Sequence, residues 1–337
     1  MILITEADQF IGFSFATHLA QYKQLRPYLR LLCQNKLRCH GFAQAGIQVC
    51  TVQDYNDKEA LQDALYGVHH LVLATGNDKD RVTNTENLVK IAAALKVKNT
   101  ICISHVGAVS TKHESLQDYT EIETVVMDYV HHHWTILRLD FIQQYFHHWA
   151  TYIEKTSQIL LPLAEDVSIC PIHISDVCQV IETLLLDSTS CTPVQEINER
   201  HREQIYTLSG PESISGKNIV ELLSKATGYS RFKYYQGRPM DLRYYLDNLS
   251  HDIWFDARLK MEMRQIYRDL IDHHSSYEKA YSLPSAKQIQ TYLDYFDWVQ
   301  QTSSSICVAH APMITSLPCK PIQLFFEQNA NSFKPRV

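Results

Sequence analysis

Several features that define common protein classes are missing from this chain. Its longest stretch without a charged residue, 298–319, is rich in Ser, Gln, Pro and His and does not predict a membrane helix. The amino-terminal residues have no basic segment and meet Glu6 and Asp8 at once, so we expect no signal peptide. Nine cysteines are scattered without any C-x-x-C pair, which favours thiols in a reducing compartment.

Signatures of several enzyme classes are also absent. The chain has neither the G-x-S-x-G motif of α/β-hydrolases nor a P-loop, so neither class is indicated. Its 17 histidines cluster mainly as adjacent residues, which point about 100° apart on a helix, and we predict no metal site. The formal net charge of −6 argues against direct binding of nucleic acid.

What the sequence does have is ordinary globular composition and a repeated alternation of elements. Its 337 residues are 45% hydrophobic and 20% charged, enough for a core in one or two domains. Short apolar segments alternate with helical patterns, and the segments are 1–4, 28–33, 47–52, 70–74, 100–104 and 134–138. This alternation predicts an α/β fold with a doubly wound, parallel, Rossmann-type sheet.

The second half is less regular and predicts a smaller lobe of mixed α/β and helical structure. We expect a helix over 175–186 capped by Ser175, a strand at 205–208, and a helix that begins after Ser215 and ends at Gly228. The tyrosine-rich remainder, 240–300, should be mainly helical and would form core, line a pocket or face a partner. The predicted division is therefore 1–155 for the Rossmann-type domain, 156–300 for the interleaved lobe and 301–337 for a loosely ordered tail.

Short motifs occur along almost the whole chain in a characteristic order. They are Ile2-Leu3-Ile4-Thr5 with Phe10-Ile11-Gly12, Asp54 with Gly67, Glu86-Asn87-Leu88, Ser104 with Gly107-Ala108, Thr135-Ile136-Leu137-Arg138, His173-Ile174-Ser175-Asp176-Val177 and Tyr206–Glu212. In this order they resemble the NmrA-like family, a branch of the atypical, extended short-chain dehydrogenase/reductase superfamily. The resemblance implies a dinucleotide site for NADP or NAD.

In the family, the turn after the first strand reads T-G-x-x-G-x-x-G. Here the segment runs from Thr5 to Gly12, and only its last glycine remains. Glu6 and Asp8 bring carboxylates to the turn, while Gln9 adds bulk where bare backbone normally approaches the pyrophosphate. Two alternatives stay open: binding is weakened or lost, or a reshaped loop still binds the phosphates through the amides of Phe10 and Ile11.

Other cofactor positions follow from the resemblance. Gln34 stands where NADP-binding relatives carry Arg, so the choice between NAD and NADP stays open. Asp54 matches an adenine-side acidic position and is equally suited to a turn or helix cap. The predicted cofactor-binding residues are Thr5, Gln9, Phe10, Ile11, Gly12, Gln34, Asp54, Ala74, Thr75, Gly76, Ser104, Leu139 and Phe141.

The catalytic Tyr-x-x-x-Lys pair of the superfamily is incomplete. Tyr119 is the nearest candidate, but Glu123 stands four residues on, and a carboxylate disfavours the phenolate. Ser104, His105 and Tyr119 are therefore only weak catalytic candidates. Asp140 replaces a family glycine and adds negative charge beside the expected nicotinamide site.

These departures favour a regulator or nicotinamide-nucleotide sensor that acts through a protein partner, with little or no catalysis. The alternative is an NAD(P)H-dependent oxidoreductase that acts on a quinone-like or small carbonyl substrate without the dyad. A scaffold that binds no cofactor is a third hypothesis. We expect the protein in the cytoplasm, with the nucleus also open, and neither nucleic acid nor a membrane as a direct partner.

Overall fold

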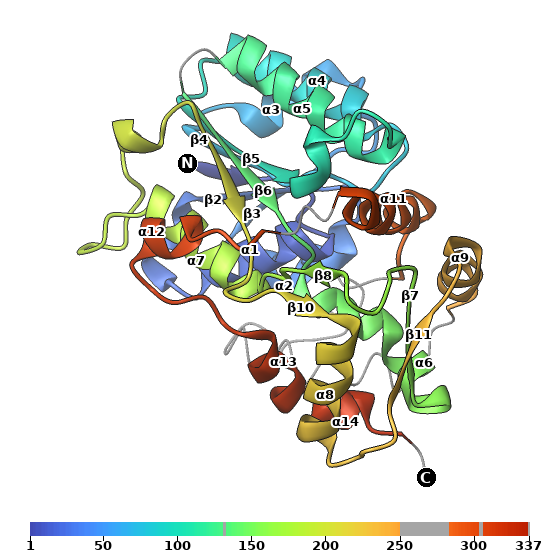
Figure 1. Cartoon of the computed structure of the whole chain (residues 1–337). Coiled ribbons are helices and arrows are strands. Elements are labelled where there is room, and N and C mark those ends of the chain that lie inside the picture. Colours follow the sequence, from blue (N-terminus) through green and yellow to red (C-terminus); the bar gives the residue numbers. More distant parts are fainter. Residues whose placement is uncertain (131–132, 250–282, 303–305, 336–337) are drawn as a thin grey trace.

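The structure is a computed structural model, described for residues 1–130, 133–249, 283–302 and 306–335. A parallel seven-stranded sheet with the order β3-β2-β1-β4-β5-β6-β9 lies at its centre (Figure 1). The strands are β1 Ile2–Ile4, β2 Leu29–Cys33, β3 Gln48–Thr51, β4 His70–Leu73, β5 Asn99–His105, β6 Trp134–Leu139 and β9 Gln204–Leu208. The strand order reverses between β1 and β4, so the prediction of a doubly wound Rossmann-type fold is confirmed.

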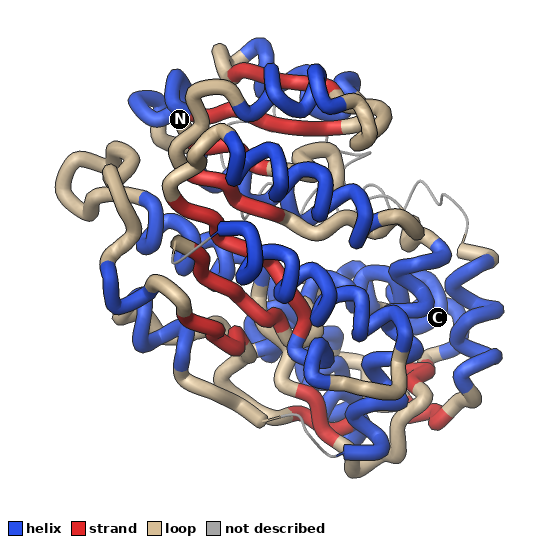
Figure 2. The backbone as a smooth tube through the Cα atoms, turned by 90° about the horizontal axis from the view of Figure 1, so that it is seen from above, coloured by secondary structure: helices blue, strands red, loops and turns tan. Residues whose placement is uncertain are grey.

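Helices cover both faces of this sheet (Figure 2). One face carries α1 Phe10–Ala20, α2 His40–Gln44 and α7 Ile174–Leu185, and the other carries α3 Lys58–Leu65, α4 Arg81–Ala94 and α5 Glu114–Val130. Side chains alternate along the strands: in β1, Ile2 and Ile4 belong to the core under α1, and Leu3 belongs to the core under α3 and α4. Short 3₁₀ helices span Lys23–Tyr28, Lys36–Cys39, Val106–Val109, Gln143–Trp149 and Glu199–His201.

A smaller lobe lies beyond the carboxyl ends of the strands and is built mainly from the second half of the chain. It has a parallel pair, β7 Gln158–Leu161 with β11 Lys233–Gln236, and an antiparallel pair, β8 Ser168–Ile169 with β10 Ile214–Ser215. Its helices are α6 Ala150–Thr156, α8 Gly216–Thr227, α9 Pro239–Asp247 and α11 Ala286–Thr302. Helix α11 packs against both α5 and α9, so it spans the junction between the sheet domain and the lobe.

Most predicted helix ends are found in the structure, with one correction. Ser215 caps α8 through the amide of Asn218, and Gly228 ends it in a left-handed conformation (φ +70°). Helix α7 begins one residue earlier than predicted, and its cap is His173, whose ring accepts from the Ser175 amide. Of the predicted helical stretch 240–300, the part 250–282 lies outside the described residues.

The prediction of a loosely ordered tail is wrong. Three short helices, α12 His310–Thr315, α13 Ile322–Gln328 and α14 Ala330–Phe333, run from beside α7 down to the lobe (Figure 1). Phe325, Phe326 and Phe333 are fully buried, and the His147 ring contacts both Phe325 and Phe333. The helices are too short to show a helical period in the sequence, which explains why the pattern did not predict them.

Among the described residues, no helix combines the length and the apolar character that crossing a bilayer requires. The same part of the chain holds no group of three His, Cys, Asp or Glu side chains arranged to bind a metal ion.

Candidate functional site

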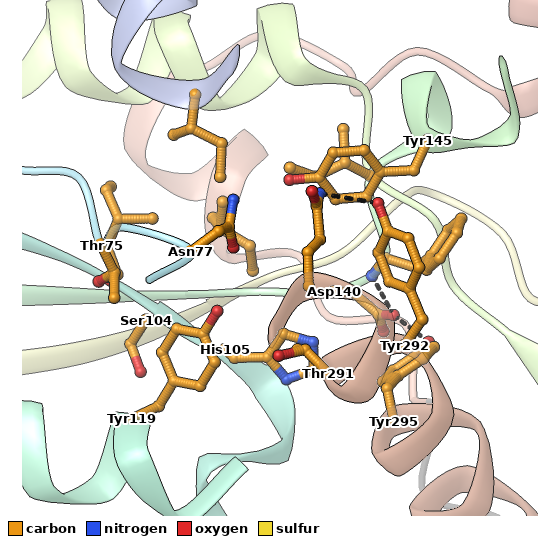
Figure 3. Close-up of a pocket in the computed structure, with 16 residues that line it drawn as sticks. Thr75, Asn77, Ser104, His105, Tyr119, Asp140, Tyr145, Thr291, Tyr292 and Tyr295 are labelled. Atoms are coloured by element: carbon orange, nitrogen blue, oxygen red, sulfur yellow. Dashed lines mark hydrogen bonds between the residues drawn. The ribbon is translucent and has the colours of Figure 1, made fainter. Parts of the chain in front are cut away.

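A cavity with largely aromatic walls lies at the carboxyl ends of β4, β5 and β6, where doubly wound folds bind ligands (Figure 3). Its empty volume is about 560 Å³, including the open mouth. Helix α11 forms one wall, and the segment after β6 forms another. The lining residues are Ile11, Thr75, Asn77, Ile103, Ser104, His105, Tyr119, Leu139, Asp140, Phe141, Ile142, Tyr145, Gln288, Thr291, Tyr292 and Tyr295.

The turn between β1 and α1 keeps the backbone shape of a glycine turn without its first glycine. Glu6 adopts φ +50°, the left-handed region that glycine normally occupies, and its carbonyl accepts from the Gln9 amide at 2.9 Å. A side chain at Gly12 could not fit, because its Cβ would lie 2.4 Å from the Thr5 and Glu6 carbonyl oxygens. Helix α1 then begins at Phe10 without a side-chain cap, as phosphate-binding helix ends do.

The Glu6 side chain is buried in the groove between this turn and the turn after β4. Tyr55 donates a hydrogen bond to the Glu6 carboxyl at 2.8 Å. The Cδ atom of Glu6 lies 3.2 Å from the position that a Cβ on Gly76 would take. Burial raises the pKa of Glu6 to about 8; the Tyr55 hydrogen bond lowers it, while the Asp8 and Asp78 charges raise it further. Glu6 is therefore mostly neutral at pH 7, which removes one of the two charges that the sequence places at the phosphate turn.

The second carboxylate of the turn points elsewhere. Asp8 is buried and accepts the Asn35 amide at 2.8 Å, while Arg38 donates to the Asp8 carbonyl at 3.3 Å. Burial raises the pKa of Asp8, while the Asn35 hydrogen bond and the Arg38 charge lower it. Asp8 thus holds the turn against the loop that follows β2.

The two predicted adenosine-side residues lie at the surface, outside the aromatic cavity. Gln34 donates to the Asp78 carboxylate at 3.1 Å and so bridges the loops after β2 and β4. Asp54 accepts from both nitrogens of Asn56, which makes it a turn residue in this structure, and Asp57 beyond it caps α3. Their contact with an adenosine stays a prediction.

These observations test whether the chain fits a dinucleotide. The glycine-like turn, the close packing at Gly12, the uncapped start of α1 and a neutral Glu6 all suit a pyrophosphate. The groove that holds the Glu6 side chain is lined in part by the predicted residues Thr5, Ala74 and Gly76 and has an empty volume of about 290 Å³. The residues of the turn fit the group, and the side chains of Glu6 and Tyr55 line the groove beside it.

Glu123, which stands in the lysine position of the dyad, forms a buried ion pair. Arg138 binds it through two hydrogen bonds of 2.8 and 2.6 Å, and Ser104 donates to it at 2.5 Å. This arrangement compensates the Glu123 charge and engages the Ser104 proton. Ser104 lines the cavity, but its hydroxyl proton points to Glu123.

Tyr119 lines the cavity next to a cation that the sequence did not reveal. The guanidinium of Arg81 lies 4.3 Å from the centre of the Tyr119 ring and is held by Asp118 at 2.8 Å. The positive charge therefore comes from α4, 38 positions before Tyr119 in the sequence, so no local motif could indicate it. In Figure 3 the Tyr119 hydroxyl points into the cavity toward Asn77.

His105 presents a neutral ring to the same cavity. Its Nδ1 accepts the Gly107 amide at 3.0 Å, which leaves the proton on Nε2. Burial lowers its pKa to about 3, with a smaller contribution from the Arg81 charge. The ring stacks on Tyr119 at 5.3 Å and meets the edge of Tyr295 at 5.4 Å. His105 can therefore donate a hydrogen bond at neutral pH without carrying charge.

The Asp140 carboxylate, which the sequence places beside the cavity, is held by two hydrogen bonds. It accepts the Tyr295 hydroxyl at 2.5 Å and the Phe141 amide at 2.6 Å. Burial, followed by the Asp140 charge, raises the pKa of Tyr295 well above its usual value. Tyr295 and Tyr292 belong to the tyrosine-rich stretch, and of its three suggested roles the structure gives both residues two: they are buried and they line the pocket.

The structure thus brings most of the predicted site residues to one edge of the sheet. Those that line the aromatic cavity are Ile11, Thr75, Ser104, His105, Tyr119, Leu139 and Phe141. Gln9, Phe10 and Gly12 lie at the start of α1. The pattern missed Asn77, Tyr145 and Arg81, because loops and a distant helix bring them to the site.

Fold and site together define a Rossmann-type protein of the NAD(P)-binding class. Residues 12–155 match the family described as NAD(P)H-binding. The prediction of a Rossmann-type, NAD(P)-binding fold is confirmed. No curated protein is significantly similar in sequence.

Solved structures with the same fold include several reductases. The Citrobacter sp. triphenylmethane reductase complexed with NADP(H) is 14% identical, with a TM-score of 0.73 over 98% of this chain and 99% of that chain. An NADPH-dependent quinone oxidoreductase from Escherichia coli, complexed with NADPH, is 16% identical, with a TM-score of 0.69 over 96% and 98%. Leucoanthocyanidin reductase from Vitis vinifera with NADPH is 12% identical, with a TM-score of 0.65 over 98% and 99%.

Proposed function

We propose that the protein is an NAD(P)H-dependent oxidoreductase that reduces a planar, conjugated acceptor of the quinone type. The observation that carries this proposal is the aromatic cavity at the carboxyl ends of β4, β5 and β6, with two neutral hydrogen-bond donors on one wall. The structural neighbours named as reductases of a dye and of a quinone support the same class of acceptor.

Two regions of the chain would bind the two parts of the nucleotide. The turn from Thr5 to Gly12 would hold the pyrophosphate, and Thr75 with the segment from Leu139 to Phe141 would border the nicotinamide. The Thr75 hydroxyl donates to the Ile103 carbonyl at 2.5 Å, which fixes the turn after β4. A bound nicotinamide supplies the hydride for the reaction.

The remaining groups would act on the acceptor. Phe141, Tyr145 and Tyr292 offer ring faces against which a planar molecule can stack, and the burial of Phe141 and Tyr292 excludes water. The Nε2–H of His105 and the hydroxyl of Tyr119 would donate hydrogen bonds to the acceptor oxygen as it gains negative charge. No Tyr-x-x-x-Lys pair is required, because the hydrogen bonds stabilise the charge without a full proton transfer.

The test is oxidation of NADPH and NADH with a panel of quinones and cationic triphenylmethane dyes. Wild-type protein should turn over at least one acceptor, and Tyr119→Phe should lower kcat by about 100-fold, the cost of one such donor. Asn77→Trp would fill the cavity mouth and abolish turnover, whereas the matched variant Lys79→Trp, in the same loop outside the cavity, should leave it unchanged. Turnover that survives Asn77→Trp would refute the assignment of the cavity.

A nucleotide sensor without turnover is the second candidate, and it would act through a protein partner. The sensor hypothesis is favoured by Ser104, because its hydroxyl donates a hydrogen bond to Glu123 and is not directed at a substrate in the cavity. Nucleotide binding without oxidation of NAD(P)H by any acceptor would support the sensor over the reductase.

A further inference from the structure

Two cysteine side chains, 137 positions apart in the sequence, meet beside the sheet edge formed by β9. The sulfur atoms of Cys170 and Cys307 lie 2.7 Å apart, and both residues are thiols in this structure. Non-bonded heavy atoms rest at about 3.5–4.0 Å, whereas a disulfide bond is about 2.05 Å long. The two sulfur atoms therefore lie within the ordinary van der Waals distance, close enough for a bond to form between them.

Both segments are anchored to the residues that follow β9. The Gly210 amide donates to the Cys170 carbonyl at 2.9 Å. On the other side, the Val308 amide, next to Cys307, donates to the Ser209 hydroxyl at 2.9 Å. Because Ser209 and Gly210 are neighbours, the two cysteines approach each other from the two sides of one short, buried stretch of chain.

We propose that Cys170 and Cys307 form a disulfide bond when the protein meets a peroxide. Cys307 is half-buried and Cys170 is fully buried, so the peroxide reaches Cys307 first. It oxidises the Cys307 thiol to a sulfenic acid and leaves as water. The Cys170 thiol then attacks that sulfur, forms the S–S bond and releases a second water, so two thiols and one peroxide give one disulfide and two waters. Two equivalents of a thiol such as glutathione reduce the disulfide to the two cysteine thiols and are themselves oxidised to glutathione disulfide.

A disulfide between Cys170 and Cys307 would lie close in the sequence to helix α11, which lines the aromatic cavity. Cys307 follows the end of α11 at Thr302 by five residues, and the three tail helices come after it. Helix α11 carries Tyr292 and Tyr295 into the aromatic cavity. The disulfide would therefore fix the chain just after α11 and hold the tail on the sheet edge, so oxidation stabilises the cavity wall and the tail together.

A second pair of thiols provides an internal comparison. Cys33 and Cys39 are both buried, and the hydrogen bond that the Cys39 thiol donates to Cys33, together with burial, strongly raises the pKa of Cys39. The thiolate is the reactive form, so this pair should resist oxidation although it is close. We therefore expect peroxide to link Cys170 to Cys307 and to leave Cys33 and Cys39 unlinked.

The experiment treats the purified full chain with hydrogen peroxide, alkylates the remaining thiols and maps the peptides without reduction. We expect a linked peptide that contains Cys170 and Cys307, a rise in Tm of several degrees, and loss of both effects on addition of dithiothreitol. Cys307→Ser should abolish the linked peptide and the Tm shift, and Cys191→Ser, another half-buried cysteine, should change neither. A linked peptide that joins other cysteines in equal yield, or a wild type that is oxidised no further than Cys307→Ser, would overturn the proposal.

Discussion

Burial of Glu6 makes the stability of the protein depend on pH in a way that one substitution should remove. The pKa of this carboxyl rises from 4.5 to about 8 on folding, chiefly because burial disfavours the charged form. The folded state therefore binds the proton more tightly than the unfolded state. Stability from this group is complete below pH 4.5 and is lost as the pH rises toward 8.

The size of the effect follows from the same two pKa values. A group whose pKa differs by one between the folded and unfolded states changes the free energy of unfolding by about 1.36 kcal/mol. Integration of the two titration curves from pH 6 to pH 8 gives a loss of about 2 kcal/mol. Glu6→Gln has no ionisable group and keeps an oxygen that can accept from Tyr55. The variant should therefore become more stable relative to the wild type as the pH rises, by about 2 kcal/mol over this interval.

The assay is urea denaturation of both proteins at pH 6, 7 and 8, with Glu59→Gln as a control for an exposed glutamate on α3. The control should show a difference from the wild type that does not change with pH. If the difference between Glu6→Gln and the wild type is also constant across these pH values, Glu6 is not a buried neutral acid.

Three further outcomes follow from other parts of the structure. The double variant Glu6→Gly with Gln9→Gly should bind nucleotide more tightly, because it removes one side chain from the groove beside the turn and another from the turn itself. An unchanged Kd by calorimetry would mean that these two side chains do not hinder binding. Glu123→Gln should lower the free energy of unfolding by about 3–5 kcal/mol, since it leaves the charge on Arg138 uncompensated beside a buried amide, and urea denaturation would measure this. Phe325→Ala should cost about 3–5 kcal/mol, and a cost near zero would contradict the packing of the tail.

The fold was predictable from the sequence because its signals are local and repeated. Every strand of the parallel sheet appeared as a short apolar segment, and Ser215 and Gly228 mark the ends of α8 by their own backbone preferences. Such features depend on a few neighbouring residues, so one sequence is enough to recognise them.

The site was only partly predictable, because its decisive features depend on contacts between distant segments. The neutrality of Glu6 comes from its burial against Tyr55, 49 positions away. The partner of Asp140 is Tyr295, 155 positions away. Motif spacing identifies which residue types reach the edge of the sheet but gives neither their partners nor their protonation.

The same limit applies to the two carboxyl groups, Glu6 and Asp140, that the sequence places beside the expected cofactor site. From the sequence both are expected to repel a cofactor. In the structure, burial raises the pKa of Glu6 to about 8, so it is mostly neutral at pH 7, and the Asp140 carboxylate accepts two hydrogen bonds. The sequence supplies the charge of a side chain in water, and the fold changes it.

We propose that this chain binds a nicotinamide nucleotide whose reactive end lies at the aromatic cavity. Calorimetric titration of the purified protein with NADPH, NADH, NADP and NAD, repeated on Asn77→Trp and Lys79→Trp, tests it directly. We predict binding of one nucleotide per chain to the wild type and to Lys79→Trp, with clearly weaker binding to Asn77→Trp. Absence of binding to the wild type at millimolar concentrations of all four nucleotides would contradict it.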